Sequence, residues 1–318
     1  MSAQVSLSTC WLSHRHIDGY EMVREIVEMG FEFIELSHGI QVSLIPGVFK
    51  ALSENLIKVS SCHNFCPLPP HLTKAAPNVY QPSSPDSREL DLWVRHTLRS
   101  LDTTAHVGAN RLVTHMGSLF FFWGNPSKKL KQMVKAPLSA EELQKNEVFV
   151  KAREKLLTKM RKASPRHVER IRQCMQDIQA YATEKGIRVC AENREGLLEL
   201  PLDCETSEFC QQFADLGFVH LWHDTGHAKL KERMGFFDHE HYLQENHSAI
   251  QGFHLHDTTP DGRDHQALGD GYIDFEMVKK YFRADQVFVL ELSPKLEREQ
   301  VIQSKEYLEQ LLQSAFAG

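Results

Sequence analysis

Short apolar runs alternate with longer amphipathic segments along almost the whole chain. The runs are rich in β-branched and aromatic residues, which is typical of strands buried on both faces of a parallel sheet. They lie at residues 5–11, 31–38, 58–65, 111–117, 188–193, 219–224, 252–257 and 286–292. The segments between them have helical periodicity, and Gly30, Gly108 and Gly186 mark helix ends. Eight strand–helix units predict an α/β fold of the (β/α)8 TIM barrel type, for which about 250 residues are enough.

An open, doubly wound sheet is the alternative, but no GxGxxG turn follows any of the apolar runs. The regular alternation breaks after the fourth run, where residues 118–164 form an aromatic loop followed by a segment of helical character at 140–162. This segment has too few apolar residues for a core of its own. We therefore predict one domain over residues 1–318, with a helical, basic insertion at about 118–164 and a resumed helix from about Arg166.

The charge of the chain is unevenly distributed. The net charge is −6, yet residues 128–172 contain 14 Lys/Arg and 5 Glu, an excess of +9 that leaves −15 for the remainder. The basic segment fits either a solvated helical face or a surface that attracts phosphates or nucleic acid. The acidic remainder suits a site that holds cations.

Other bulk features point to an ordinary enzyme of the cell interior. No apolar stretch approaches the roughly 20 residues that a membrane helix needs, and the first residues, MSAQVSLSTCW, do not resemble a signal peptide. Seven scattered cysteines without a CxxC pair suit reduced thiols. We expect a cytoplasmic protein that does not enter a membrane.

Acidic residues and histidines stand at the downstream ends of seven of the eight predicted strands. They are Glu35 or His38, His63, His115, Glu192, Asp224, His254 and Glu291. Active sites of such barrels lie at the C-terminal ends of the strands, where carboxylates alone would repel one another. A shared cation removes that repulsion. A set of two Glu, one Asp and one His suits one divalent ion, Mn²⁺ or Mg²⁺, with Zn²⁺ or Co²⁺ as alternatives.

The order of these residues resembles the xylose-isomerase-like TIM barrel superfamily. The chain has Glu192, then Asp224-x-x-His227, then His254-x-x-Asp257, then LGDGYIDF at 268–275, and finally Glu291. The superfamily includes sugar and sugar-phosphate isomerases and epimerases, dehydratases and endonuclease IV. The resemblance implies a metal ion held by Glu192, Asp224, His254 and Glu291. It also implies substrate contacts from His63, His115, His227, Arg263 and His265.

The implied chemistry is proton transfer at a carbon next to a carbonyl, through a metal-stabilised enediolate. Glu192 and Glu291 are the expected acid–base pair, because two carboxylates near one cation can hold different pKa values. The expected substrate is a small sugar, sugar phosphate or related hydroxy-carbonyl compound. A homo-oligomer is compatible with this expectation, and a nucleic acid partner is not expected.

Two alternatives use the same residues. A dehydratase would run on the same metal site. An endonuclease IV-like nuclease for apurinic/apyrimidinic sites would hold three metals with ligands at His63, His115, Glu192, Asp224, His227, His254, His265 and Glu291. Its pattern also requires an aspartate where this chain has Arg263. The side chain of the neighbouring Asp264 is expected to point away, which favours a single metal and the isomerase.

Overall fold

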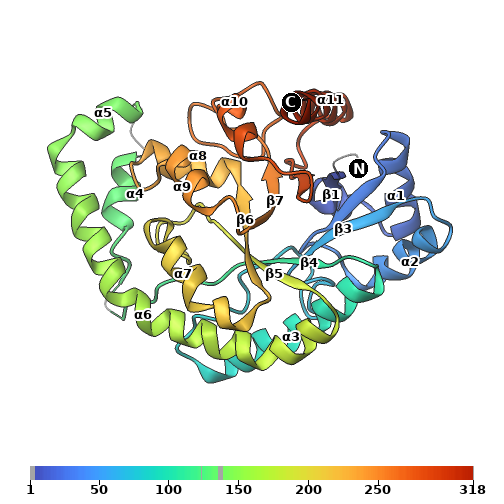
Figure 1. The fold of residues 1–318 in the computed structure, drawn as a ribbon, viewed down its shortest axis with the longest axis horizontal. Coiled ribbons are helices and arrows are strands. Elements are labelled where there is room, and N and C mark those ends of the chain that lie inside the picture. Colours follow the sequence, from blue (N-terminus) through green and yellow to red (C-terminus); the bar gives the residue numbers. More distant parts are fainter. Residues whose placement is uncertain (1–3, 123, 135–138, 318) are drawn as a thin grey trace.

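The computed structural model describes residues 4–122, 124–134 and 139–317 and contains a closed barrel of eight parallel strands. The strands are β1 (Gln4–Ser8), β2 (Phe33–Leu36), β3 (Lys58–His63), β4 (Arg111–Thr114), β5 (Arg188–Glu192), β6 (Val219–Asp224), β7 (Ile250–Leu255) and β8 (Val287–Leu290). Each strand pairs with the next in sequence, and β8 pairs with β1. The predicted (β/α)8 barrel is confirmed, with all eight strands at the predicted places (Figure 1).

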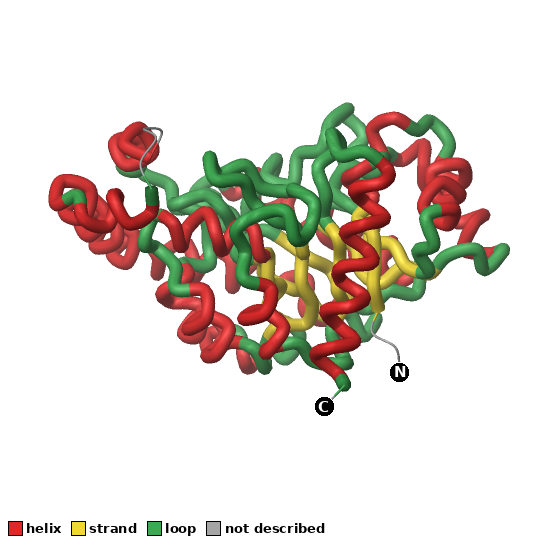
Figure 2. The backbone as a smooth tube through the Cα atoms, turned by 90° about the horizontal axis from the view of Figure 1, so that it is seen from above, coloured by secondary structure: helices red, strands yellow, loops and turns green. Residues whose placement is uncertain are grey.

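Helices surround the barrel, with the strands at the centre of the molecule (Figure 2). They are α1 (Gly19–Glu28), α2 (Ile45–Ser53), α3 (Ser87–His106), α4 (Lys128–Val134), α5 (Ala140–Lys145), α6 (Glu147–Glu184), α7 (Thr206–Gln212), α8 (Thr225–Arg233), α9 (His239–Asn246), α10 (Phe275–Val278) and α11 (Arg298–Phe316). Aspartates cap several of them: Asp18, Asp86 and Asp224 accept hydrogen bonds from first-turn amides of α1, α3 and α8. No helix within the described ranges is both long enough and apolar enough to span a bilayer.

Helix α6 differs from the prediction. We predicted a helix from about Arg166, separated from the insertion at Pro165, but one helix of 38 residues runs through Pro165. A proline inside a helix removes one hydrogen bond and costs about 3 kcal/mol. Buried side chains on both sides of it, Ala163 and Val168 among them, hold the helix against the barrel. Tertiary packing therefore overrides the local signal.

Helices α4, α5 and residues 147–162 of α6 extend from one side of the barrel, at the left of Figure 1; we call them the arm. Their buried side chains, Leu130, Leu143, Phe149, Leu156 and Met160, belong to the same apolar cluster that fills the space between barrel and helices. The arm thus has no separate core.

An apolar layer inside the barrel lies directly beneath a polar layer at its C-terminal end. Val113, Cys190, Trp222, Val287 and Val289 form a small closed cluster inside it. Strand side chains two positions apart point to the same face. Two positions beyond Cys190, Trp222 and Val289 are Glu192, Asp224 and Glu291. The alternation therefore places a layer of acidic side chains next to the apolar cluster, at the C-terminal end of the barrel.

Candidate metal centre and active site

Four buried side chains meet at the C-terminal end of the barrel. Each of Glu192, Asp224, His254 and Glu291 offers one ligand atom, and these four atoms all lie within 4.8 Å of one another. The four side chains are at most 7 % exposed. They come from β5, β6 and β7 and from the position directly after β8. The oxygen and nitrogen donors and their spacing fit a divalent cation.

His254 lies between carboxylates. Its Nδ1 is 2.7 Å from Glu192 Oε1 and 3.0 Å from Glu291 Oε2, and its Nε2 is 3.1 Å from both oxygens of Glu35. Burial alone would lower the pKa of His254, but the surrounding carboxylates outweigh it and raise the pKa well above 6.5. A site with so much negative charge around one imidazole is suited to a positive ion.

Glu192 is held from several sides. Its Oε2 accepts a hydrogen bond from Arg194 Nη1 at 2.8 Å and lies 3.0 Å from His115 Nε2 and 3.7 Å from His63 Nε2. Burial would raise the pKa of Glu192, yet Arg194 and the histidines lower it well below its usual range. For His115, burial and then the Arg194 charge lower the pKa to about 4. Glu192 is therefore a carboxylate, with a neutral imidazole of His115 beside it at pH 7.

Asp224 is oriented by neighbours on both of its oxygens. Oδ1 accepts a hydrogen bond from the backbone amide of His227 at 2.7 Å, and Oδ2 is 3.0 Å from His256 Nε2. Burial opposes ionisation of Asp224, but His227 and His256 lower its pKa. The ring of His256 in turn stacks on His265 at 4.3 Å. His256 thus positions both a candidate ligand and a histidine of the rim.

The rim contains a second group of possible ligands, His227, Asp264 and His265. The expectation that the Asp264 side chain points away is wrong: Asp264 Oδ1 lies 3.0 Å from His265 Nδ1, and Oδ2 lies 3.9 Å from His227 Nε2. The cause is a left-handed backbone at His265, with φ of 55°, held by a hydrogen bond from its amide to His256 Nδ1. Burial would lower the pKa of His265, but Asp264 and Glu291 raise it to about 9.

The other predicted residues divide between the site and the surface. His63 and His115 form a third group with Glu192, because Asn64 O and Asn78 Oδ1 bind their Nδ1 atoms and leave Nε2 facing inward. Arg263 lies apart from all of them: its side chain is 72 % exposed and pairs with Asp261 at 3.2 Å. The structure therefore brings together every predicted site residue except Arg263.

Arg194 was not predicted from the sequence. Its guanidinium is only 10 % exposed and contacts Glu192, Glu195 at 2.9 Å and Glu199 at 3.4 Å. These carboxylates outweigh the effect of burial and raise its pKa further. The sequence did contain an indication of its role, since Arg194 follows Glu192 by two positions at the end of a strand. Arginines at such positions are, however, often exposed on the surface. Its burial is visible only in the fold.

Comparisons with known proteins agree with this architecture. The family model described as "Xylose isomerase-like TIM barrel" matches residues 23–311. No curated protein matches the sequence. Solved structures do match. A D-tagatose 3-epimerase-like protein has a TM-score of 0.69 at 15% identity, covering 99% of this chain and 98% of that one.

Two further epimerase structures are similar at the level of the fold. For 3-keto-D-glucoside 4-epimerase from E. coli the TM-score is 0.66 at 15% identity, with 97% of this chain and 99% of that chain covered. For L-ribulose 3-epimerase the TM-score is 0.67 at 14% identity, with 98% and 95% covered. Since the family model spans most of the sequence, the chain belongs to the xylose isomerase-like TIM barrel family.

Proposed function

We propose that the protein is a divalent-metal-dependent sugar isomerase or epimerase that transfers a proton at a carbon next to a carbonyl. The observation that carries the proposal is the buried set of Glu192, Asp224, His254 and Glu291, whose ligand atoms lie within 4.8 Å of one another. The similarity in fold to a D-tagatose 3-epimerase-like protein and to L-ribulose 3-epimerase supports the same class of reaction. Mn²⁺ and Mg²⁺ suit the oxygen-rich donor set best.

In this proposal the ion would polarise the carbonyl and hydroxyl oxygens of the sugar. Glu192 and Glu291 are the proton-transfer pair, because they approach His254 Nδ1 from two different strands, at 2.7 and 3.0 Å. The surroundings hold both carboxyls ionised: Arg194 acts on Glu192, and His254 acts on Glu291, so that the pKa of each is well below its usual range. An ionised carboxylate is the form that a general base requires.

The negative charge around the four-ligand site favours a neutral sugar as the substrate over a sugar phosphate. Carboxylates near the site are Glu35, Glu192, Glu195, Glu199, Asp224, Asp264 and Glu291. Arg194 is already engaged by three of these carboxylates, and the imidazoles of His254 and His265, whose pKa values the carboxylates raise, are likewise paired with them. A phosphorylated sugar would meet a negative field here, and among the described residues of the four-ligand site the one guanidinium, Arg194, is already paired. We therefore favour a free ketose over a sugar phosphate.

Solvent exchange of the α-hydrogen tests the proposal. Protein loaded with Mn²⁺ or Mg²⁺ is incubated in D₂O with a panel of free ketoses and with the matching ketose phosphates, and deuterium incorporation is followed by NMR. We expect exchange with at least one free ketose, and loss of exchange in Glu192→Gln and Glu291→Gln. Exchange confined to the phosphates contradicts the neutral-substrate assignment, and its absence throughout the panel contradicts the isomerase proposal. A dehydratase would instead show net loss of water from the sugar.

A second candidate is a three-metal nuclease, favoured by one observation. Three further groups of possible ligands adjoin the central four: His63 and His115 with Glu192, Asp264 and His265 with His227, and His256 and His265 with Glu291. Asp264 thus supplies the carboxylate that the sequence lacks at position 263. Against this candidate, the Arg194 guanidinium binds the Glu192 oxygen that faces His115, where a second cation would be repelled. Incision of duplex DNA containing an abasic site is the direct test.

A further inference from the structure

A row of polar side chains lies inside the barrel on the side formed by β1, β2 and β3. Ser8, Glu35 and Ser61 are register partners on these adjacent strands, and all three are fully buried. The four candidate ligands come instead from β5, β6, β7 and the end of β8. Glu35 is one of the strand-end acids at the mouth, yet it is not among the four residues whose ligand atoms lie within 4.8 Å of one another. Its burial therefore calls for a role other than membership of that set.

Both oxygens of Glu35 accept hydrogen bonds within the barrel. Ser8 Oγ donates to Oε1 at 3.1 Å, and Ser61 Oγ donates to Oε2 at 2.8 Å. His254 Nε2 lies 3.1 Å from each of the two oxygens. Because a carboxylate can only accept, Nε2 must carry a hydrogen and donate it to Glu35. The contact therefore fixes Nε2 as a protonated nitrogen of His254.

The imidazole ring of His254 separates Glu35 from the other carboxylates. While Nε2 points to Glu35, Nδ1 faces Glu192 Oε1 at 2.7 Å and Glu291 Oε2 at 3.0 Å. A half-turn of the ring about its bond to Cβ would place carbon atoms where the two nitrogens now lie, and the hydrogen bond to Glu35 would be lost. Nδ1 is therefore the nitrogen that the fold turns toward the candidate ligands.

The surroundings also hold the plane of the His254 ring. The His63 ring stacks on it with centroids 5.8 Å apart and 9° between the planes, and Trp222 packs against it at 5.3 Å and 65°. Trp222 belongs to the small apolar cluster inside the barrel. The ring is thus restrained by packing and by its hydrogen bond to Glu35.

We propose that Glu35 is a positioning residue of the metal centre, which holds the Nε2–H of His254 and presents Nδ1 as the ligand atom. A histidine that binds a metal commonly donates its other ring N–H to a carboxylate, which fixes the tautomer and raises the basicity of the ligating nitrogen. Ser8 and Ser61 orient that carboxylate in turn. The proposal rests on the divalent-ion site of the proposed function. It assigns a role to a residue outside the four-ligand set.

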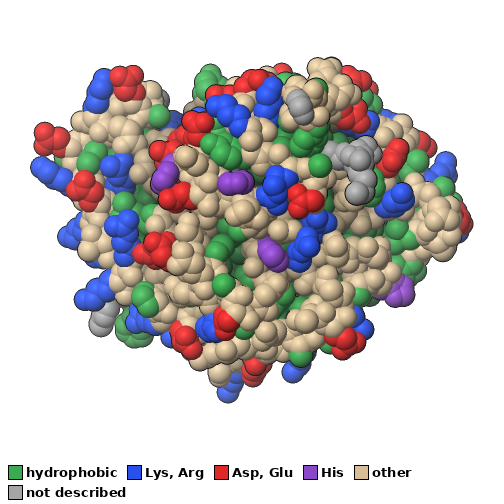
Figure 3. Space-filling model, in the orientation of Figure 1, with side chains coloured by type: hydrophobic (Ala, Val, Ile, Leu, Met, Phe, Trp, Pro, Cys, Tyr) green, Lys and Arg blue, Asp and Glu red, His purple; other side chains and the backbone are tan. Residues whose placement is uncertain are grey.

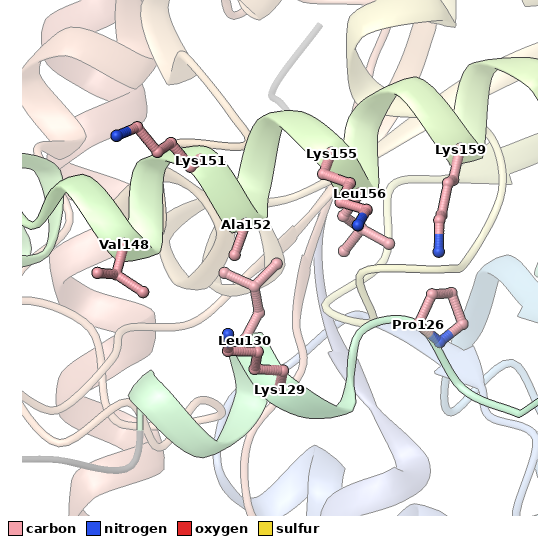
Figure 4. Close-up of a pocket in the computed structure, with 9 residues that line it drawn as sticks. All are labelled: Pro126, Lys129, Leu130, Val148, Lys151, Ala152, Lys155, Leu156 and Lys159. Atoms are coloured by element: carbon pink, nitrogen blue, oxygen red, sulfur yellow. The ribbon is translucent and has the colours of Figure 1, made fainter.

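A metal titration of this protein reports chiefly on the mouth of the barrel. The groups of three or more possible ligands among the described residues lie there. A groove on the arm, with a volume of about 410 Å³, is lined by four lysines, among them Lys151 and Lys155, and by apolar side chains, so that it repels cations (Figure 4). Exposed carboxylates on the face in Figure 3 are interspersed with Lys and Arg. A single carboxylate supplies too few oxygen atoms to bind a divalent ion tightly.

Calorimetric titration with Cd²⁺ as the probe tests the contribution of Glu35. Glu35→Gln keeps the shape of the side chain but removes its charge and one acceptor, so we expect the affinity for Cd²⁺ to fall about 10–100-fold. Glu35→Asp keeps the charge but withdraws it from His254, and a similar loss is expected. The control Glu195→Gln removes a carboxylate that contacts Arg194 instead, and it should change the affinity less than about fivefold. Unchanged affinity in Glu35→Gln, full affinity in Glu35→Asp, or an equal loss in the control overturns the proposal.

NMR of the unmodified protein identifies the bound nitrogen without any change at Glu35. Protein with ¹⁵N-labelled histidine is loaded with ¹¹³Cd²⁺, and the signals of His254 are assigned by comparison with His254→Gln. We expect ¹¹³Cd–¹⁵N coupling at Nδ1 and a hydrogen on Nε2. Coupling at Nε2 overturns the proposal but leaves the metal centre and the proposed function in place. Cd²⁺ that couples to neither nitrogen, or that does not bind at all, contradicts the metal centre itself and with it both proposals.

Discussion

Replacement of Glu192 by glutamine separates its catalytic role from its structural one. The carboxylate is fully buried, accepts a hydrogen bond from Arg194 at 2.8 Å and lies 2.7 Å from His254 Nδ1. The amide of Glu192→Gln has one acceptor instead of two, so that it meets either Arg194 or His254 with a donor. Loss of one partner of a buried ion pair costs about 3–5 kcal/mol. Because Arg194 keeps its contacts with Glu195 and Glu199, we expect the lower end, about 3 kcal/mol.

The loss of activity in Glu192→Gln should be larger than its loss of stability alone can explain. Removal of a proton-transfer group costs about 10²–10⁴ in rate, and the same change removes one of the four candidate metal ligands. The assays are α-hydrogen exchange with a free ketose, metal titration by calorimetry, and urea unfolding. The matched control is Glu195→Gln, which also loses a contact with Arg194 but is 42 % exposed and lies outside the four-ligand set. Exchange within about twofold of the unmodified protein in Glu192→Gln would refute the assignment, since a general base is worth far more than that.

Three further changes probe the fold. Burial lowers the pKa of His239 to about 4, and its Nε2 lies 2.8 Å from that of His223. The free energy of unfolding should therefore fall by about 3 kcal/mol as the pH drops from 6.5 to about 4. The variant His239→Gln should reduce this pH dependence in urea titrations. Gly226→Ala places a Cβ 2.1 Å from the His256 ring; we expect a loss of about 1–3 kcal/mol in thermal unfolding, and an unchanged melting temperature would contradict this. Phe149→Ala empties a fully buried position in the arm; about 3–5 kcal/mol should be lost by urea unfolding, whereas a loss below about 1 kcal/mol would show that the arm is not packed as described.

The sequence predicts the barrel and its acidic layer well because both follow from simple periods. Strand side chains alternate with a period of two, so a carboxylate at the end of an apolar run, such as Glu192 or Glu291, is placed inside the barrel by the same rule that buries its neighbours. A parallel barrel then brings these strand ends together. These periods place seven candidate side chains at the strand ends, and the choice of four of them as possible metal ligands came from the family resemblance.

The features that the sequence did not predict depend on tertiary contacts. The direction of Asp264 is set by the left-handed backbone of His265, which a hydrogen bond to His256 holds in place. Burial of Arg194 requires the carboxylates of Glu195 and Glu199 on the following loop. The passage of α6 through Pro165 requires a barrel surface to pack against. None of these contacts leaves a periodic signal in the chain.

The same contacts decide between the two proposed functions. Arg194 places a positive charge on Glu192, and Asp264 places a carboxylate beside His227. The first disfavours a second cation next to Glu192, and the second favours an additional cation at the rim. The number of bound metals therefore reports directly on which of these two effects prevails.

A metal count with identification of the element, on protein purified without chelator, tests the central claim most directly. The account predicts one Mn²⁺ or Mg²⁺ per chain, lost in Glu192→Gln, together with exchange of the α-hydrogen of a free ketose. Three metals per chain with incision of abasic DNA would contradict it and establish the nuclease instead.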